Sequence, residues 1–163
     1  FAVSNRKGPT ALVFTRQNVP LLKAPGIAPA AGLRQGGYIL WEQSTGTPQA
    51  ILLATGSEVA LALQAAQRLV DEGIGARVVS LPSWEIFDEQ PQSYRHAVLP
   101  PNVRLRVAIE AGIGLGWEHY IGLEGAVIGM KGFGASAPAK ILFEKFGFTV
   151  EAAVAKVKEL LVR

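Results

Sequence analysis

The stretch QAILLATGSEVALALQAAQRL, residues 49–69, decides the fold, because it contains two different periodicities in succession. Its first part, residues 49–54, is a continuous apolar run, which is typical of a parallel strand buried on both faces. Thr55 and Glu58 then stand three positions apart, which is the spacing of a capping box at the start of a helix. The sequence therefore predicts a buried strand that turns directly into a helix.

The residues after Glu58 continue this pattern with an amphipathic helix. Apolar residues recur at helical spacing and form one stripe; they are Val59, Leu63, Ala66 and Val70. Gly73 is well placed to end the helix, and residues 77–81 predict a second strand that ends at Pro82. Together these segments make a strand–helix–strand unit of about 35 residues, whose crossover is expected to be right-handed.

Further elements flank this unit on both sides. We expect an edge strand at residues 37–41, short helices within residues 84–98, strands at residues 103–109 and 126–128, and helices at residues 139–146 and 150–161. Thr149 is expected to cap the last of these helices. The strand at residues 103–109 alternates at first and then becomes continuously apolar, so it is expected to begin half exposed and to end buried. The predicted fold class is α/β, an open, mostly parallel sheet with helices on both faces.

The chain before residue 35 has a different character. Residues 11–14 are an apolar run that predicts another buried strand. Five breaking residues follow, so this segment is not expected to hold a helix or a central strand, and we expect a linker that runs over a surface. They are Pro20, Pro25, Gly26, Pro29 and Gly32. We expect a domain boundary here, with residues 1–34 as the end of one domain plus a linker and residues 35–163 as an α/β domain. The chain begins at Phe1, so both a processed protein and a piece of a larger one stay open.

The composition excludes several kinds of site and partner. The net charge is +3 and the 16 Lys and Arg residues are scattered, so nucleic-acid binding is not indicated. The absence of cysteine excludes disulfides and thiolate sites, and two histidines exclude a histidine-rich metal site. No apolar run approaches the roughly 18 residues of a membrane span, and residues 1–7 lack the core of a signal peptide. We expect no membrane partner and a cytoplasmic location.

The turn at residues 55–58 is a candidate binding site. Ligands gather at the carboxyl ends of strands in open α/β sheets, and a helix N-terminus can hold a phosphate. However, Glu58 places a negative charge where a phosphate would bind, and a carboxylate stabilises a helix N-terminus by itself. We therefore favour a helix cap over a phosphate site at this turn.

Four other side chains are weaker candidates. Glu110 follows an apolar strand, where a carboxylate can be catalytic, but no partner is evident and we favour a structural role. Ser136 precedes Pro138 and is expected to cap the next helix. His96 and His119 are isolated in the sequence, and His119 is expected to lie on a helix. None of these residues predicts a complete active site.

Arg16 stands at the end of the apolar run at residues 11–14, followed by Gln17 and Asn18. An arginine offers two parallel donors that match the geometry of a phosphate group, which a lysine does not. An ordinary exposed loop arginine fits the pattern slightly better on residue types alone.

Several segments closely resemble the C-terminal end of transketolases. They are GPTALVFTRQNVP (8–20), GGYIL (36–40), ILLATGSEVALALQAAQRL (51–69), GIGARVVSLPSWEIFDEQPQSYRHAVLP (73–100), RVAIEAGIGLGWEHYIG (106–122) and KGFGASAPAKILFEKFGFT (131–149). They occur in the family's order over nearly the whole chain, and their combination is specific although each alone would be weak.

The resemblance implies a thiamine-diphosphate enzyme that transfers a two-carbon ketol unit between phosphorylated sugars of the pentose phosphate pathway. It implies a divalent cation, magnesium or calcium, that holds the cofactor, and a homodimer of three-domain chains. Residues 1–34 would then end the pyrimidine-binding domain, and residues 35–163 would be the C-terminal domain. The family's [ST]-R-Q-N motif is intact at residues 15–18, so Arg16 corresponds to the arginine that contacts the sugar phosphate.

The same resemblance implies no catalytic, cofactor-binding or metal-binding residue in this chain, because those positions of the family lie upstream. The chain alone is therefore expected to be inactive, and its partners are the remaining transketolase domains. Two alternatives stay open. One is the C-terminal domain of a related thiamine-diphosphate enzyme, a dihydroxyacetone or deoxyxylulose phosphate synthase. The other is a freestanding, non-catalytic α/β binding module.

Overall fold

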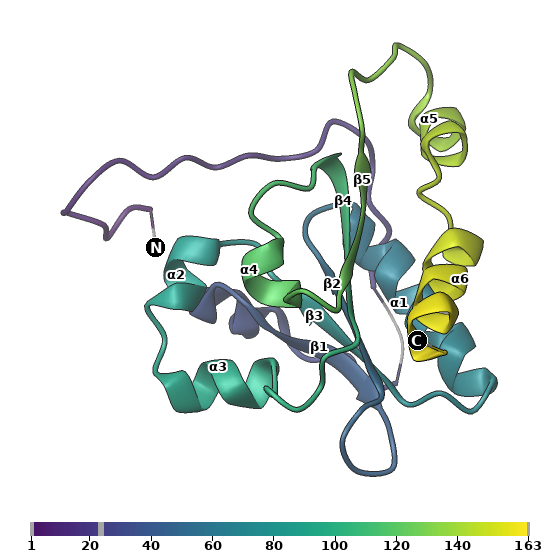
Figure 1. Cartoon of the computed structure of the whole chain (residues 1–163). Coiled ribbons are helices and arrows are strands. Elements are labelled where there is room, and N and C mark those ends of the chain that lie inside the picture. Colours follow the sequence, from purple (N-terminus) through teal and green to yellow (C-terminus); the bar gives the residue numbers. More distant parts are fainter. Residues whose placement is uncertain (1, 23–24, 163) are drawn as a thin grey trace.

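The computed structural model describes residues 2–22 and 25–162. A five-stranded sheet forms its centre, with the strand order β1-β3-β2-β4-β5 (Figure 1). The strands are β1 (Tyr38–Gln43), β2 (Ala50–Ala54), β3 (Ala76–Ser80), β4 (Arg106–Ile113) and β5 (Ala126–Met130). The α-helices are α1 (Glu58–Asp71), α2 (Trp84–Asp88), α3 (Gln92–Val98), α4 (Glu118–Ile121), α5 (Ala139–Phe146) and α6 (Val150–Leu161).

Strand β2 occupies the middle of the sheet. Each of its five residues has an exposed fraction of 0%. It pairs in parallel with β3 and with β4, so that Leu52 lies between Val78 and Val107. The buried parallel strand predicted at residues 49–54 is therefore confirmed, and so is the strand–helix–strand unit that it begins. Strand β1 is antiparallel to β3 and forms one edge, as the sequence predicts.

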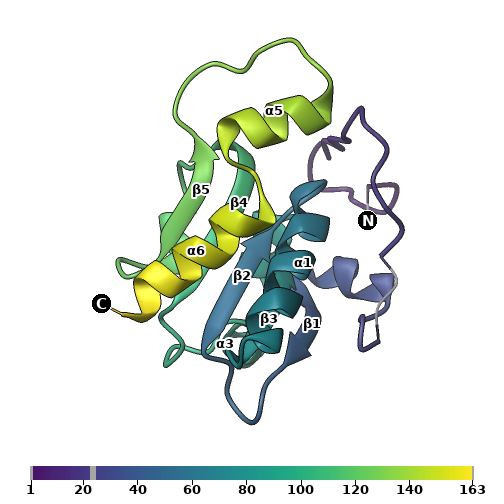
Figure 2. The same ribbon diagram turned by 90° about the vertical axis from the view of Figure 1, so that its right-hand side faces the viewer.

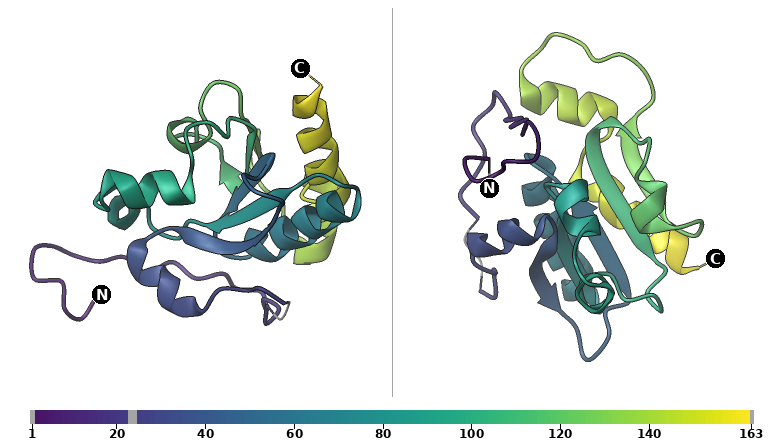
Figure 3. Two further views of the ribbon diagram at one scale, coloured as in Figure 1. Left: turned by 90° about the horizontal axis from the view of Figure 1, so that it is seen from below. Right: turned by 90° about the vertical axis from the view of Figure 1, so that its left-hand side faces the viewer.

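Helices cover both faces of the sheet, which confirms the predicted fold class. Figure 2 shows α1 and α6 in front of one face, with α5 above them, and α2, α3 and α4 lie on the other face (Figures 1 and 3). Because side chains of a strand alternate between faces, Leu52 packs into the core beneath α1 and α6, and Ile51 and Leu53 pack into the opposite core.

The connection after β2 and the connection after β4 lead toward opposite edges of the sheet. From β2 the chain passes through α1 outward to β3, and from β4 it passes through α4 outward to β5 on the other side. Neighbouring strands whose connections leave in opposite directions define a topological switch point, where a crevice opens at the carboxyl ends of the strands. In this chain the switch point lies between the turn at residues 55–58 and the end of β4.

The strand predicted at residues 11–14 does not form. These residues are extended but paired with no strand among the described residues, and the exposed fractions of Leu12, Val13 and Phe14 are 65%, 92% and 81%. Figure 1 shows this part of the chain running away from the sheet. An apolar run becomes a strand only where a sheet edge supplies hydrogen-bonding partners. The described part of this chain brings no such edge beside residues 11–14.

The predicted linker runs over the surface of the α/β domain and is held there. The backbone N–H of Ala28 donates to the carbonyl of Leu40 at 2.8 Å, and the indole of Trp41 donates to the carbonyl of Pro25 at 3.1 Å. The expectation that this segment holds no helix is wrong at its end, where residues Ala30–Gln35 form a 3-10 helix, η1. Pro29 precedes η1 in an extended conformation, and a proline there removes no helical hydrogen bond.

Strand β4 begins later than predicted. The sequence places its start at residue 103, but the ladder begins at Arg106. The Arg106 guanidinium donates to the carbonyls of Val103 and Tyr120, at 2.9 and 2.5 Å, and to those of Leu99 and Pro100. Val103 is buried in this connection rather than in the sheet. Within residues 103–109 the expected order is confirmed, because residues 104–106 are exposed or half buried and residues 107–109 are buried. Beyond Ile109 the strand continues to Ile113 and becomes more exposed again.

The two predicted serine and threonine caps have different outcomes. The Thr149 hydroxyl accepts a hydrogen bond from the N–H of Ala152 at 3.1 Å, so this residue caps α6 as predicted. Ser136 does not cap α5, because Pro138 occupies the cap position without a side-chain hydrogen bond. Gly147, with φ of 81°, ends α5 in the left-handed conformation that glycine favours.

We predict that Thr149→Ala lowers the free energy of unfolding by about 1 kcal/mol, because the N–H of Ala152 loses its acceptor. Ser136→Ala is the matched control: Ser136 is exposed and caps no helix, so its change should stay within about 0.5 kcal/mol of zero. Urea denaturation of the three proteins measures both values. Equal losses in the two variants would contradict the assigned cap.

Candidate functional site

The switch point places two carboxyl groups that are far apart in the sequence at neighbouring strand ends. Glu58 is the first residue of α1, directly after the turn that follows β2. Glu110 lies near the end of β4, the strand that pairs with β2. The sequence left Glu110 without an evident partner, and the structure supplies Glu58.

Glu58 is buried, with an exposed fraction of 4%. Its carboxylate accepts a hydrogen bond from the Ser57 hydroxyl at 2.5 Å and another from the backbone N–H of Ala111. Burial raises the pKa of Glu58, and hydrogen bonds from the Ser57 hydroxyl, from the Ala111 N–H and from its own backbone N–H act against this increase. The carboxylate therefore joins the turn after β2 to the end of β4.

The capping box predicted from Thr55 and Glu58 is wrong. The N-cap position of α1 is Ser57, which has helical backbone angles and makes no side-chain cap hydrogen bond. A capping box needs the carboxylate to bond back to the N–H of the cap residue. The Glu58 carboxylate is instead turned inward, toward Ala111, so tertiary contact replaces the local motif.

Glu110 is half buried near the end of β4. Desolvation raises the pKa of Glu110, and the charge of Glu58 adds to it, to about 7. The carboxyl lies over Gly112, where a Cβ atom would be 3.3 Å from its Oε1. Strongly perturbed carboxyls in a crevice are candidates for function. The structural role favoured from the sequence for Glu110 stays a prediction.

The described residues do not make a metal centre around this pair. Neither carboxyl has an ion pair with a described lysine, arginine or histidine. Within residues 2–22 and 25–162 there is also no group of three or more His, Cys, Asp or Glu side chains that could hold a metal ion. The chemistry that the pair offers is proton binding.

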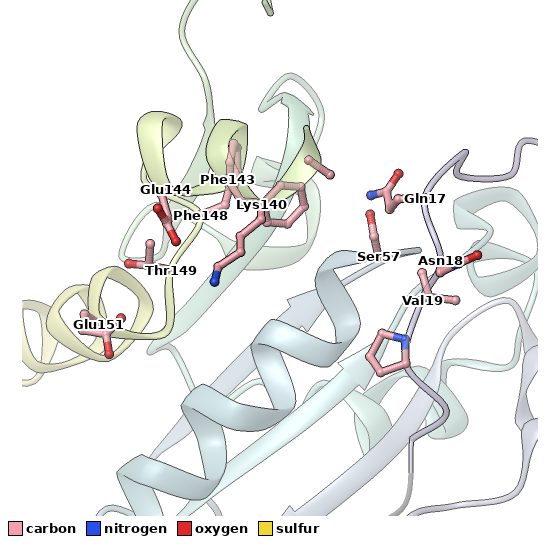
Figure 4. A pocket seen from close by; sticks show the side chains of 12 residues that line it. Gln17, Asn18, Val19, Ser57, Lys140, Phe143, Glu144, Phe148, Thr149 and Glu151 are labelled. Carbon is pink, nitrogen blue, oxygen red and sulfur yellow. The ribbon is translucent and has the colours of Figure 1, made fainter. Parts of the chain in front are cut away.

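A pocket of about 410 Å³ opens beside the turn at residues 55–58, between the N-terminal segment and the α/β domain. Figure 4 shows Gln17 and Ser57 on one side of it and Lys140, Phe143 and Thr149 on the other. The pocket is lined by Gln17, Asn18, Val19, Pro20, Ser57, Ala139, Lys140, Phe143, Glu144, Phe148, Thr149 and Glu151. Ser57 therefore belongs both to the pocket and to the hydrogen bonds of Glu58.

Arg16 lies immediately before this pocket, in the exposed N-terminal segment. Within the described part of the chain its guanidinium has no hydrogen bond or ion pair, whereas its neighbours Thr15 and Gln17 are joined by their side chains. Its donors are thus all available to an outside group.

The histidines lie apart from the carboxyl pair. His119 is on α4, as predicted, and its Nε2 is 3.4 Å from the Asp88 carboxylate. His96 is on α3, with its Nε2 3.5 Å from the amide nitrogen of Gln92. Both helices lie on the face of the sheet opposite α1, so neither histidine joins Glu58.

No helix in the described ranges is both long and apolar enough to cross a lipid bilayer.

We predict that the free energy of unfolding falls as pH rises from about 4.5 to about 7. The folded pKa of Glu110 lies above its unfolded value, so the folded state binds more protons in this window and loses that advantage as pH rises. The contribution should be about 1–3 kcal/mol. It should be smaller in Glu110→Gln, when urea denaturation is measured at intervals across this range. Parallel curves for the two proteins would argue against the perturbed carboxyl.

A family model described as the transketolase-like TK C-terminal domain matches residues 36–149. Transketolase 1 of Escherichia coli (strain K12) is 50% identical over 161 residues, which are 99% of this chain and 24% of that relative. The transketolase from Leishmania mexicana superposes with a TM-score of 0.74 at 47% identity, over 82% of this chain and 19% of the other.

A transketolase from Pichia stipitis in complex with sedoheptulose 7-phosphate superposes with a TM-score of 0.79 at 35% identity. The match covers 90% of this chain and 20% of that one. This chain thus spans about a quarter or less of the length of these relatives. Because the family model covers most of the α/β domain and relatives match along the whole sequence, the chain belongs to the transketolase family and carries its C-terminal domain.

Proposed function

We propose that this chain is the C-terminal part of a transketolase, an enzyme that transfers a two-carbon ketol unit between phosphorylated sugars of the pentose phosphate pathway. The proposal is supported by relatives that are themselves named transketolases and that match 98% or more of this chain. They favour this family over the related synthases and over a freestanding module. The remaining transketolase domains and a second copy of the full-length enzyme are the proposed partners, in the cytoplasm, with no nucleic acid or membrane.

The proposed domain division places the end of the pyrimidine-binding domain and a linker at residues 1–34, and the C-terminal domain at residues 35–163. The contrast between the exposed residues 11–14 and the buried sheet supports this division, and so does a family match that begins at residue 36. Phe1, residues 23–24 and Arg163 lie outside the described residues. The apolar side chains of residues 11–14 would be covered by the sheet of the preceding domain.

Arg16 is the proposed sugar-phosphate contact. The observation that carries this assignment is an exposed guanidinium with no partner among the described residues, inside an intact Thr-Arg-Gln-Asn motif at residues 15–18. A planar guanidinium donates two parallel hydrogen bonds to a phosphate group and so fixes its orientation as well as its charge. Arg16 would thereby hold the end of the sugar remote from the reacting carbons.

The described residues do not fit the cofactor that the family implies. Thiamine diphosphate is held in the full-length enzyme through a divalent cation, magnesium or calcium, which needs several oxygen ligands together. The described residues hold no group of three or more such side chains. We therefore assign no catalytic, cofactor-binding or metal-binding residue to this chain, and the other domains would supply the carbanion chemistry.

We predict that Arg16→Ala in the full-length enzyme raises the KM for a phosphorylated ketose roughly 10- to 100-fold. Loss of a hydrogen bond to a charged group weakens binding by about 1.5–3 kcal/mol, and each 1.4 kcal/mol is about a factor of ten. Arg6→Ala is the matched control, because Arg6 is exposed in the same segment but outside the motif. Steady-state kinetics with phosphorylated and unphosphorylated ketoses separate the phosphate contact from a general effect. The proposed role would be overturned by an equal loss on both substrates, or by an unchanged KM.

We also predict that this chain alone shows no binding of thiamine diphosphate at micromolar concentration, with or without Mg²⁺. Isothermal titration calorimetry measures this, and the full-length enzyme serves as the positive control. Micromolar binding by residues 1–163 would refute the proposed division of labour between the domains.

A further inference from the structure

A second cavity lies at the end of the sheet opposite to the switch point. Its volume is about 450 Å³, and small-molecule sites have volumes of roughly 300–1,000 Å³. Its lining residues fall within 96–106 and 121–124, in the connections that lead into β4 and β5. The cavity shares no lining residue with the pocket of Figure 4, so it is separate from the segment that carries Arg16.

Arg106 is the fixed cation of this cavity. Its Nε donates to the Val103 carbonyl at 2.9 Å, and Nη1 donates to the Tyr120 carbonyl at 2.5 Å. Its Nη2 donates to the carbonyls of Leu99 and Pro100, at 3.2 and 2.8 Å. A guanidinium has five N–H groups, so these contacts hold it in one orientation and still leave a donor for a ligand.

The charge of Arg106 has no acidic partner in the described part of the chain. The carbonyls around it are dipoles without net charge, and no described carboxylate forms an ion pair with it. Burial withdraws water from the guanidinium and lowers the pKa of Arg106, although an arginine stays protonated in a protein. A partly desolvated charge without a counter-ion is unfavourable, so an anion that enters the cavity would reduce this cost.

The other charged side chains of the cavity determine how much negative charge it accepts. Arg104 and Glu124 both line it and pair with each other, with Nη1 of Arg104 2.7 Å from Oε1 of Glu124. These two charges cancel, which leaves the single positive charge of Arg106 when His96 is counted as neutral. One carboxylate balances that charge. A phosphate monoester carries about −1.5 to −2 at pH 7 and exceeds it.

The rest of the lining is apolar. Leu99, Val103 and Ile121 are buried, whereas Pro101 and Leu123 are exposed. Leu123 has an exposed fraction of 104%, so nothing in the described chain covers it. An apolar side chain beside a charged cavity favours a ligand that combines an apolar body with its charge.

We propose that this cavity binds a small organic monocarboxylate, whose carboxylate lies against Arg106 and Arg104 and whose apolar body lies against Leu123. Arg104 uses one N–H for Glu124 and keeps the others for a ligand. Arginine donors match the two oxygens of a carboxylate in geometry as well as in charge. The site belongs to the α/β domain, and it rests neither on the proposed function nor on what Arg16 binds.

The test is a titration of the isotopically labelled chain with benzoate at pH 7 and low ionic strength, followed by amide NMR spectra. We expect saturable shifts of the amide signals of Val103, Arg104, Gly122 and Leu123, with a Kd on the order of 1 mM. Benzamide has the same shape without the charge and should bind about tenfold or more weakly, because a charge-assisted hydrogen bond is lost. Phenyl phosphate and inorganic phosphate should also bind more weakly than benzoate.

Two surface variants test the site without removing the carbonyl contacts of Arg106. Leu123→Ala truncates a side chain that the described chain leaves uncovered, so folding should be unaffected and the Kd for benzoate should rise about three- to tenfold. Arg104→Gln removes one cation and leaves Glu124 unpaired, so the Kd should rise about tenfold or more. Arg34→Gln is the control, because Arg34 is an exposed arginine on η1 outside the cavity, and it should keep the wild-type Kd.

Glu124→Gln tests the charge balance from which the ligand class is inferred. It removes the only acidic side chain that lines the cavity and frees Arg104, so phenyl phosphate should gain more affinity than benzoate. Glu89→Gln is the control for this change, since Glu89 is an exposed acid outside the cavity, and it should leave both affinities unaltered.

Any of the following results would overturn the proposal: no saturable shift up to about 20 mM benzoate, shifts confined to amides outside the cavity, or equal binding of benzoate and benzamide. Wild-type affinity in both Leu123→Ala and Arg104→Gln would do the same. Tighter binding of inorganic phosphate than of benzoate would reject a monocarboxylate as the ligand class. An unchanged preference in Glu124→Gln would reject the charge balance.

Discussion

The burial of β2 on both faces is the constraint on which the rest of this structure depends. All five residues of the strand are withdrawn from water, and burial of a Leu or Ile side chain contributes roughly 1.5–3 kcal/mol. A strand with two apolar faces requires helices on both sides, and the chain meets this with α1 and α6 on one face and α2 to α4 on the other. The reversal of direction that follows places the ends of β2 and β4 at one switch point.

The elements that local pattern determines could be predicted from the sequence. The run at residues 50–54 and the stripe of α1 contain their own periodicity, and Thr149 carries its own cap signal. Residues 11–14 carry an equally clear strand signal, but pairing depends on an edge that the described chain does not bring there. At Glu58 the local signal for a capping box was real and was overridden, because burial against Ala111 satisfies the same carboxylate better.

The carboxyl pair could not be predicted in the same way. Glu58 and Glu110 belong to different strand ends, and what brings them together is the parallel pairing of β2 with β4. Glu110 also stands directly before an irregularity in the pairing of β4 with β5, which the alternation of the sequence does not predict. The sequence did indicate that both positions lie at carboxyl ends of strands. An acidic residue at the carboxyl end of each of these two strands was the available signal for the pair.

The chain thus combines an α/β domain around a buried sheet with an exposed N-terminal segment, in which Arg16 is the proposed sugar-phosphate contact. The central claim is that β2 organises the domain without help from residues 11–14. Native-state amide hydrogen exchange of this chain tests it most directly. The account predicts that Ile51 and Leu53 exchange only through global unfolding, while residues 12–14 exchange nearly as fast as an unstructured peptide. Protection of residues 12–14 comparable to that of β2, or exchange of β2 well below the global free energy of unfolding, would contradict it.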